Sequence, residues 1–124
     1  MRAIEIVSVG NAEIQTAPLP ELRDHFILVK VNAVAINPTD WYVYQQWAEC
    51  MLRSSQLSRK HIDFEFLATK GTTVVALGPK VTKDYKPGAR IVDVTHGFNA
   101  SHLHSGCFGE YCVVKEGVTF KVPT

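Results

Sequence analysis

The sequence predicts a mainly β domain with one helix, arranged as a small barrel or sandwich. Short segments rich in β-branched residues recur along the chain and are separated by Gly and Pro turns, while only one segment shows the spacing of an amphipathic helix. A chain of 124 residues, with 46 % hydrophobic residues and a net charge of +1, suits a single globular domain. Short strands with one helix favour a barrel or sandwich.

Charge and hydropathy exclude several partners. The 13 basic and 12 acidic side chains leave no basic excess for nucleic acid. No run approaches the roughly 18 apolar residues of a membrane span, and the first residues do not read as a signal peptide. The three cysteines, Cys50, Cys107 and Cys112, are widely spaced and odd in number, which is a poor disulfide framework. We therefore expect a cytoplasmic protein with free thiols.

The first third of the chain predicts three strands. Residues Arg2–Val7 alternate in polarity and end at a Gly-Asn turn, after which Glu13–Thr16 returns as a second short strand. The strongest strand is Phe26–Ile36, in which β-branched and polar residues alternate. Pro38 ends it, because proline lacks the N–H that a ladder needs and restricts the residue before it.

One helix is predicted over Asp40–Arg53. The carboxylate of Asp40 can cap it by accepting from backbone N–H groups one turn further on. Apolar side chains then recur on one face, at Tyr44, Ala48, Met51 and Leu52.

The last half of the chain predicts four more strands. Thr72–Leu77 is β-branched and ends at a Gly-Pro turn, and Arg90–Val94 follows a Lys-Pro-Gly turn. The segments Cys107–Lys115 and Val118–Val122 flank the pair 116–117, which predicts a hairpin.

The segment Asn37–Trp41 is the first candidate for chemistry, because it lies at a strand-to-helix junction where backbone N–H groups and polar side chains reach a ligand. Its Asn, Thr and Asp could bind an amide or a ribose. An Asx turn with a helix cap explains the same residues, and chemistry alone favours that interpretation.

Two further groups are weaker candidates. A zinc site could use the imidazoles and the thiolate of His96, His102, His104 and Cys107. His61 and Asp63 could form a His–carboxylate pair. Neither follows a recognised metal or catalytic motif, so we favour polar loop residues in both cases.

Five short motifs occur in an order that resembles a known domain. They are Ile36–Trp41, Thr73–Gly78, Tyr85–Ile91, Gly106–Tyr111 and Phe120–Pro123. In this order they resemble the GroES-like N-terminal domain of the medium-chain dehydrogenase/reductase superfamily. The resemblance implies a GroES-like, partly open β-barrel with one helical insertion over residues 1–124. The resemblance is nearest to the zinc-independent branch, which comprises quinone reductases and the fungal trans-acting enoyl reductases that serve polyketide synthases.

The resemblance implies an oxidoreductase that uses NADPH and no metal. Zinc alcohol dehydrogenases of the superfamily carry a metal-ligating Cys where Asn37 stands here, and Asn cannot replace that thiolate. In zinc-free relatives the Asn-Pro-x-Asp segment lies against the nicotinamide and its ribose, and a nearby Lys helps to bind the dinucleotide. For this sequence, the resemblance implies that the cofactor-binding residues are Asn37, Pro38, Thr39, Asp40, Trp41 and Lys60.

The same resemblance implies hydride transfer from NADPH to the β-carbon of an activated C=C bond. The substrate would be a small-molecule or carrier-bound enoyl compound, and the partner a polyketide synthase. Catalytic residues are not assigned.

Three departures from the family pattern qualify this expectation. Residues 42–59 form an atypical insertion, which we interpret as intron-like sequence, and a Gly-x-Asp-x-x-Gly segment is missing before Val74. The chain stops at Thr124, where relatives enter a Rossmann domain with its Gly-rich loop. We therefore expect that domain to be absent and these 124 residues to be inactive alone. The alternatives are a non-enzymatic GroES-like interaction module and a non-functional remnant.

Overall fold

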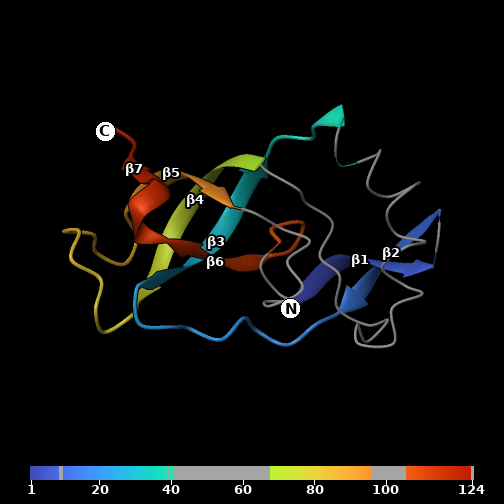
Figure 1. Ribbon diagram of the computed structural model, residues 1–124, viewed down its shortest axis with the longest axis horizontal. Coiled ribbons are helices and arrows are strands. Elements are labelled where there is room, and N and C mark those ends of the chain that lie inside the picture. The colour runs from blue at the N-terminus through green and yellow to red at the C-terminus, as the bar shows by residue number, and fades with distance from the viewer. Residues whose placement is uncertain (9, 39, 41–67, 96–105, 124) are drawn as a thin grey trace.

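The computed structural model describes residues 1–8, 10–38, 40, 68–95 and 106–123, and these form a mainly β structure (Figure 1). In chain order the elements are β1 (Arg2–Ser8), β2 (Asn11–Thr16), β3 (Phe26–Val34), β4 (Ala68–Leu77), β5 (Arg90–Thr95), β6 (Tyr111–Lys115), the short 3-10 helix η2 (Glu116–Val118) and β7 (Thr119–Lys121). The predicted strands are thus confirmed with shifted ends: β4 begins four residues earlier than predicted, β6 begins four residues later, and β3 ends two residues earlier.

The strands belong to two antiparallel sheets. β1 and β2 form a hairpin, and the other five strands form one sheet in the order β6-β3-β4-β5-β7. Figure 1 shows the hairpin at one end of the long axis and the five-stranded sheet at the other. The main-chain N–H of Ile4 donates to the carbonyl of Phe108 over 2.7 Å, which ties the hairpin to the segment that leads into β6.

Alternation along the strands places one face of the five-stranded sheet inside. In β3, Ile27 and Val29 are fully buried, whereas Lys30, the next residue, is exposed. β-branched side chains fit such a half-buried pleated surface well. The core cluster consists of Ile27, Val29, Val74, Tyr85, Ile91, Cys107, Cys112 and Val114.

The sheet curls into an open barrel. β6 and β7 lie on opposite edges of the sheet order, yet only the three residues of η2 separate them. The two edges must therefore approach each other at η2. β6 pairs with β3 and β7 pairs with β5, so no ladder closes the barrel between these two strands.

The hairpin predicted for the last two strands is therefore wrong. A tight hairpin needs a two-residue turn that keeps both strands in one ladder. Here Glu116–Val118 form a 3-10 turn instead, and the chain crosses the open end of the barrel to reach β5.

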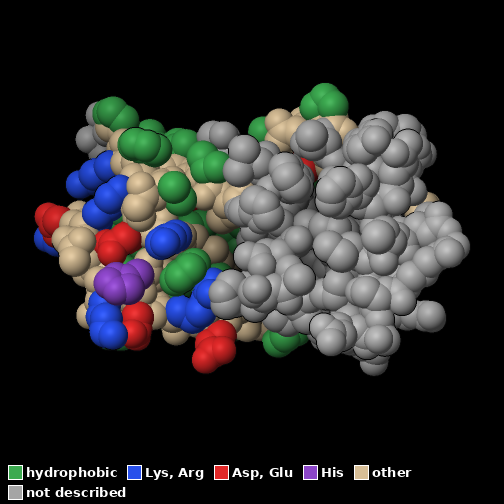
Figure 2. Space-filling view, viewed as in Figure 1, with side chains coloured by type: hydrophobic (Ala, Val, Ile, Leu, Met, Phe, Trp, Pro, Cys, Tyr) green, Lys and Arg blue, Asp and Glu red, His purple; other side chains and the backbone are tan. Residues whose placement is uncertain are grey.

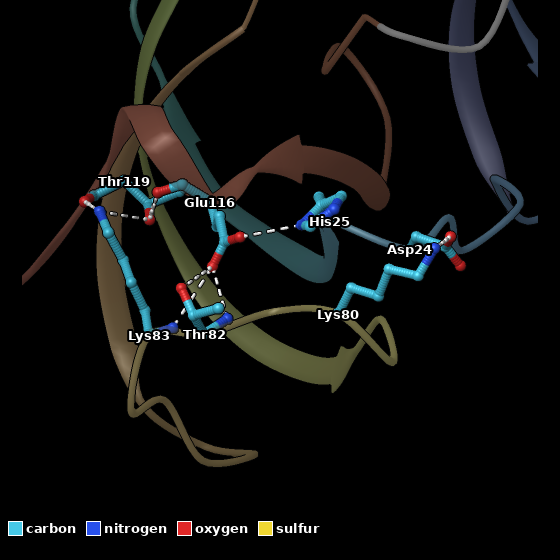
Figure 3. Close-up of polar contacts among 7 residues, drawn as sticks. All are labelled: Asp24, His25, Lys80, Thr82, Lys83, Glu116 and Thr119. Atoms are coloured by element: carbon cyan, nitrogen blue, oxygen red, sulfur yellow. Dashed lines mark hydrogen bonds and ion pairs between the residues drawn. The ribbon is translucent and has the colours of Figure 1, made fainter.

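A carboxylate holds this crossing in place (Figure 3). Glu116 Oε2 accepts from the backbone N–H of Thr82 at 2.7 Å and from that of Lys83 at 3.3 Å, while Oε1 lies 3.2 Å from Nδ1 of His25. The backbone N–H of Thr82 lowers the pKa of Glu116 below its ordinary value of 4.5, and the His25 ring and Lys83 N–H add to this effect. One side chain thus joins the entrance of β3, the loop after β4 and η2.

Thr119, the first residue of β7, completes the crossing. It is 1 % exposed, and its hydroxyl donates to the carbonyl of Glu116 at 2.8 Å. Its carbonyl accepts from Lys83 Nζ at 2.6 Å and from the Tyr85 hydroxyl at 3.2 Å. The loop after β4 is therefore bonded to both sides of η2.

Two expectations fall on residues that the structure leaves undescribed. Apart from Asp40, the helix predicted over Asp40–Arg53 lies outside the described residues. The insertion 42–59 lies wholly outside them. Among the described residues, no helix is long and apolar enough to cross a membrane.

Replacing Glu116 by Gln should lower the thermal unfolding midpoint at pH 7, because a neutral amide accepts more weakly from the Thr82 and Lys83 N–H groups. Since the folded pKa of Glu116 lies below the unfolded value, its contribution is present above pH 4.5 and disappears as the pH falls through the folded value. The unfolding midpoints of the unaltered chain and of Glu116→Gln should therefore converge as the pH is lowered from 7 to 3. Equal midpoints at pH 7 would contradict this role. The control Glu13→Gln changes an exposed carboxylate on β2.

Gly78→Ala should destabilise the domain by about 1–3 kcal/mol. A Cβ at this position would collide with the backbone carbonyl oxygens of Arg23, Asp24 and Phe26. Urea unfolding measures the effect. The control Gly71→Ala places a Cβ with no atom within 4 Å and should shift stability by less than about 1 kcal/mol. An equal loss of stability in the two variants would show that the close approach of the backbone carbonyls to Gly78 is not the cause.

Candidate functional site

The chain leaves β3 through a tight corner at Asn37–Asp40. Helical backbone begins at Pro38, so Asn37 occupies the N-cap position and Pro38 the first helical position, where its missing N–H costs nothing. Asp40 Oδ2 accepts from the backbone N–H of Asn37 at 2.7 Å, and the Asp40 N–H donates to the Asn37 carbonyl at 3.0 Å. The first bond is the backward half of a capping box, in which the side chain of the third helical residue accepts from the N-cap N–H. The second is a main-chain bond of the first turn.

The predicted cap position is wrong, because Pro38 is already helical and Asp40 therefore lies inside the first turn rather than before it. The Asp40 carboxylate accepts from the N–H of Asn37, three residues earlier. The predicted bonds from N–H groups further along the helix fall outside the described residues.

Burial separates the roles of the corner residues. Asp40 is 1 % exposed, Asn37 is half-buried and Pro38 is exposed. Ile36 precedes them with 79 % of its surface exposed. The buried carboxylate thus fixes the backbone, and the surface of the corner is offered by Asn37 and its neighbours.

The other predicted site residues divide into described and undescribed positions. Those outside the described residues are Thr39, Trp41, Lys60, His61, Asp63, His96, His102 and His104. Cys107 is 1 % exposed, and its Sγ lies 3.4 Å from the hydroxyl of Thr95. Within the described ranges, no three His, Cys, Asp or Glu side chains are grouped as metal ligands.

An apolar pocket lies between the hairpin and the five-stranded sheet. Its volume is about 400 Å³, and its lining is mostly aliphatic and aromatic. The lining residues are Arg2, Ala3, Ile4, Ile14, Val31, Val34, Cys107, Phe108, Gly109 and Glu110. Sequence reasoning missed this pocket, because its walls come from strands whose relative placement depends on contacts distant in sequence. Val34 on its wall is three residues before Asn37.

An ion pair belongs to the lining of this pocket. Arg2 Nε and Nη2 donate to Glu110 Oε1 at 3.1 and 3.0 Å, and the Arg2 backbone N–H donates to Oε2 at 2.8 Å. The backbone N–H and then the guanidinium of Arg2 lower the pKa of Glu110 below 4.5. The pair joins β1 to the start of β6.

A second polar group that the sequence did not single out is buried inside the barrel. Asp93 is fully buried on β5, and its Oδ2 accepts from the Thr72 hydroxyl of β4 at 2.7 Å. The alternation of inward and outward residues along β5 could have predicted this burial, since Asp93 falls between the inward residues Ile91 and Thr95.

An open antiparallel barrel with a hairpin at its side and a capped corner after β3 defines a GroES-like β domain. A family model described as the alcohol dehydrogenase GroES-like domain matches residues 23–124. The chain belongs to this family, within the medium-chain dehydrogenase/reductase superfamily, as the order of its motifs predicted.

Relatives and solved structures agree with this assignment. The chain is 32 % identical to trans-enoyl reductase resD of Aspergillus sclerotiorum, over 99 % of this chain and 31 % of the relative. It is 38 % identical to trans-enoyl reductase ffsC of Aspergillus flavipes, over 86 % of this chain and 26 % of that one. A mycobacterial protein solved in complex with NADPH shares the fold, with a TM-score of 0.71 and 23 % identity over 99 % of this chain and 34 % of its own. The chain spans about a third of the length of these proteins.

Asp40→Ala should cost about 1–3 kcal/mol of folding stability, because it leaves the Asn37 N–H without its carboxylate acceptor in a buried place. Asp40→Asn keeps a side-chain oxygen at the same position and should retain most of the stability. Chemical unfolding of the two variants beside the unaltered chain gives the comparison. A fully stable Asp40→Ala variant would show that the corner does not depend on this bond.

Proposed function

We propose that this chain is the GroES-like part of an NADPH-dependent enoyl reductase, and that its Asn37–Trp41 corner forms the nicotinamide side of the cofactor site. The observation that carries the proposal is the locked corner after β3, in which a buried carboxylate holds Asn37 at the surface of a helix start. Relatives named trans-enoyl reductases and a fold neighbour complexed with NADPH support the choice of reaction and cofactor.

The described residues fit such a role in part. Asn37 carries an amide that can donate and accept, and the exposed rigid ring of Pro38 beside it suits contact with a flat ring. Asp40 is too buried for direct contact, so we give it the role of positioning Asn37. Thr39, Trp41 and Lys60 complete the proposed set of contacts. NADPH, when bound, supplies the hydride, and the chain supplies orientation.

The substrate in this proposal is an α,β-unsaturated acyl thioester, carried by a polyketide synthase in the cytoplasm. The apolar pocket of about 400 Å³ offers space for an acyl chain, and its Val34 wall is close in sequence to the corner. We further propose that the 124 residues do not turn over alone, because they contain no Gly-rich pyrophosphate loop.

Millimolar NADPH should shift the backbone amide signals of Ile36, Asn37 and Asp40 in two-dimensional NMR spectra, and leave those of Thr82 and Glu116 at the far crossing unchanged. Weak binding to the folded form should also raise the melting midpoint, following RT ln(1 + [L]/Kd).

Asn37→Ala should weaken both effects, whereas Asn32→Ala, which alters an exposed amide on β3, should not. Absence of any shift at millimolar NADPH, or shifts centred away from the corner, would overturn the proposed role.

A further inference from the structure

The outer face of the five-stranded sheet carries a row of side chains that the reductase proposal does not use. Tyr111 of β6 pairs with Lys30 of β3, Lys30 pairs with Thr73 of β4, and Thr73 pairs with Arg90 of β5. Neighbouring strands lie about 4.8 Å apart, so Lys30 and Arg90 stand about 10 Å from each other across Thr73. We call Lys30, Thr73 and Arg90 the basic row.

The cations of the basic row are not neutralised within the part of the chain that the structure describes. Lys30 and Arg90 are exposed and take part in none of the ion pairs there. In contrast, Arg2 is paired with Glu110 and Lys80 with Asp24. None of the four residues in register across the sheet is acidic. Figure 2 shows Lys and Arg side chains interspersed with Asp and Glu side chains over the part of the molecule that holds this sheet.

An apolar row runs beside the basic row, two residues further along the strands. Gly71 of β4 pairs with Val92 of β5, and Val92 pairs with Phe120 of β7. Phe120 is 66 % exposed, and Lys83 Nζ lies 5.7 Å from the centre of its ring. Since Gly71 has no side chain and a Cβ there would meet no atom within 4 Å, the surface next to Val92 is open.

We propose that this outer face is a docking surface for an acidic polypeptide segment that carries apolar side chains. Carboxylates of the segment would pair with Lys30 and Arg90, and an apolar side chain would cover Phe120 and Val92. Charge complementarity of this kind guides association and selects partners. The almost neutral chain, at +1, lacks the broad positive field that nucleic acid requires, so the peptide is favoured. The inference does not depend on the proposed reductase function.

The test uses an acidic probe peptide, Glu-Glu-Leu-Glu-Glu-Leu-Glu-Glu, titrated into the isotope-labelled chain. We expect amide shifts concentrated at Lys30, Thr73, Arg90 and Phe120, and an affinity that falls as NaCl is added. The double variant Lys30→Glu with Arg90→Glu should bind about tenfold more weakly or worse. Both side chains are exposed, so the fold should survive, and the retained spectrum checks this.

The controls separate this surface from general charge effects. Lys86→Glu reverses one charge, half the change made in the double variant, at an exposed turn residue outside both rows and should leave binding unchanged. Phe120→Ala should weaken binding without altering its salt dependence. A peptide with Gln in place of Glu should not bind. Equal affinity of the double variant, binding of the Gln peptide, or tighter binding of a single-stranded oligonucleotide than of the acidic peptide would overturn the proposal.

Discussion

The open barrel depends on keeping its two edge strands, β6 and β7, close together, and the Glu116 carboxylate bonds across the place where they meet. A five-stranded antiparallel sheet has two free edges, and here β6 and β7 at those edges are joined by η2 alone. Without a ladder between them, this junction is held by bonds that Glu116 accepts from the N–H groups of Thr82 and Lys83 and by its contact with His25. The bonds that the Thr119 carbonyl accepts add to it. Charge-assisted bonds to backbone N–H groups are stronger than neutral ones, which suits a junction without a continuous ladder.

Local pattern predicted the strands well, because alternation and β-branching report directly on which side chains face the core. It could not predict which strands pair. Lys115 and Thr119 lie four residues apart, and locally they read as two arms of a hairpin. Their partners are Phe26 and Asp93, far away in sequence, and the curvature of the whole sheet decides this pairing. The apolar pocket escaped prediction for the same reason.

The corner after β3 shows a different limit. The sequence placed polar residues and a cap at 37–41, and the structure shows helical backbone at Pro38 and Asp40, so the cap falls on Asn37 and not on Asp40. The pattern alone could not place the start, because Asn and Asp are both good N-cap residues. Asp40 is 1 % exposed and its carboxylate accepts from the Asn37 N–H, so it supports the corner from inside.

The alternation that builds the barrel also separates two surfaces by function. Inward positions such as Val29, Val74 and Ile91 are committed to the core. The outward positions between them are free to carry charge, and Lys30 and Arg90 occupy two of them in one register. A change on the outer face therefore leaves both the core and the corner intact. The cofactor role proposed for the corner and the docking role proposed for the outer face can thus be altered one at a time, although both rest on β3.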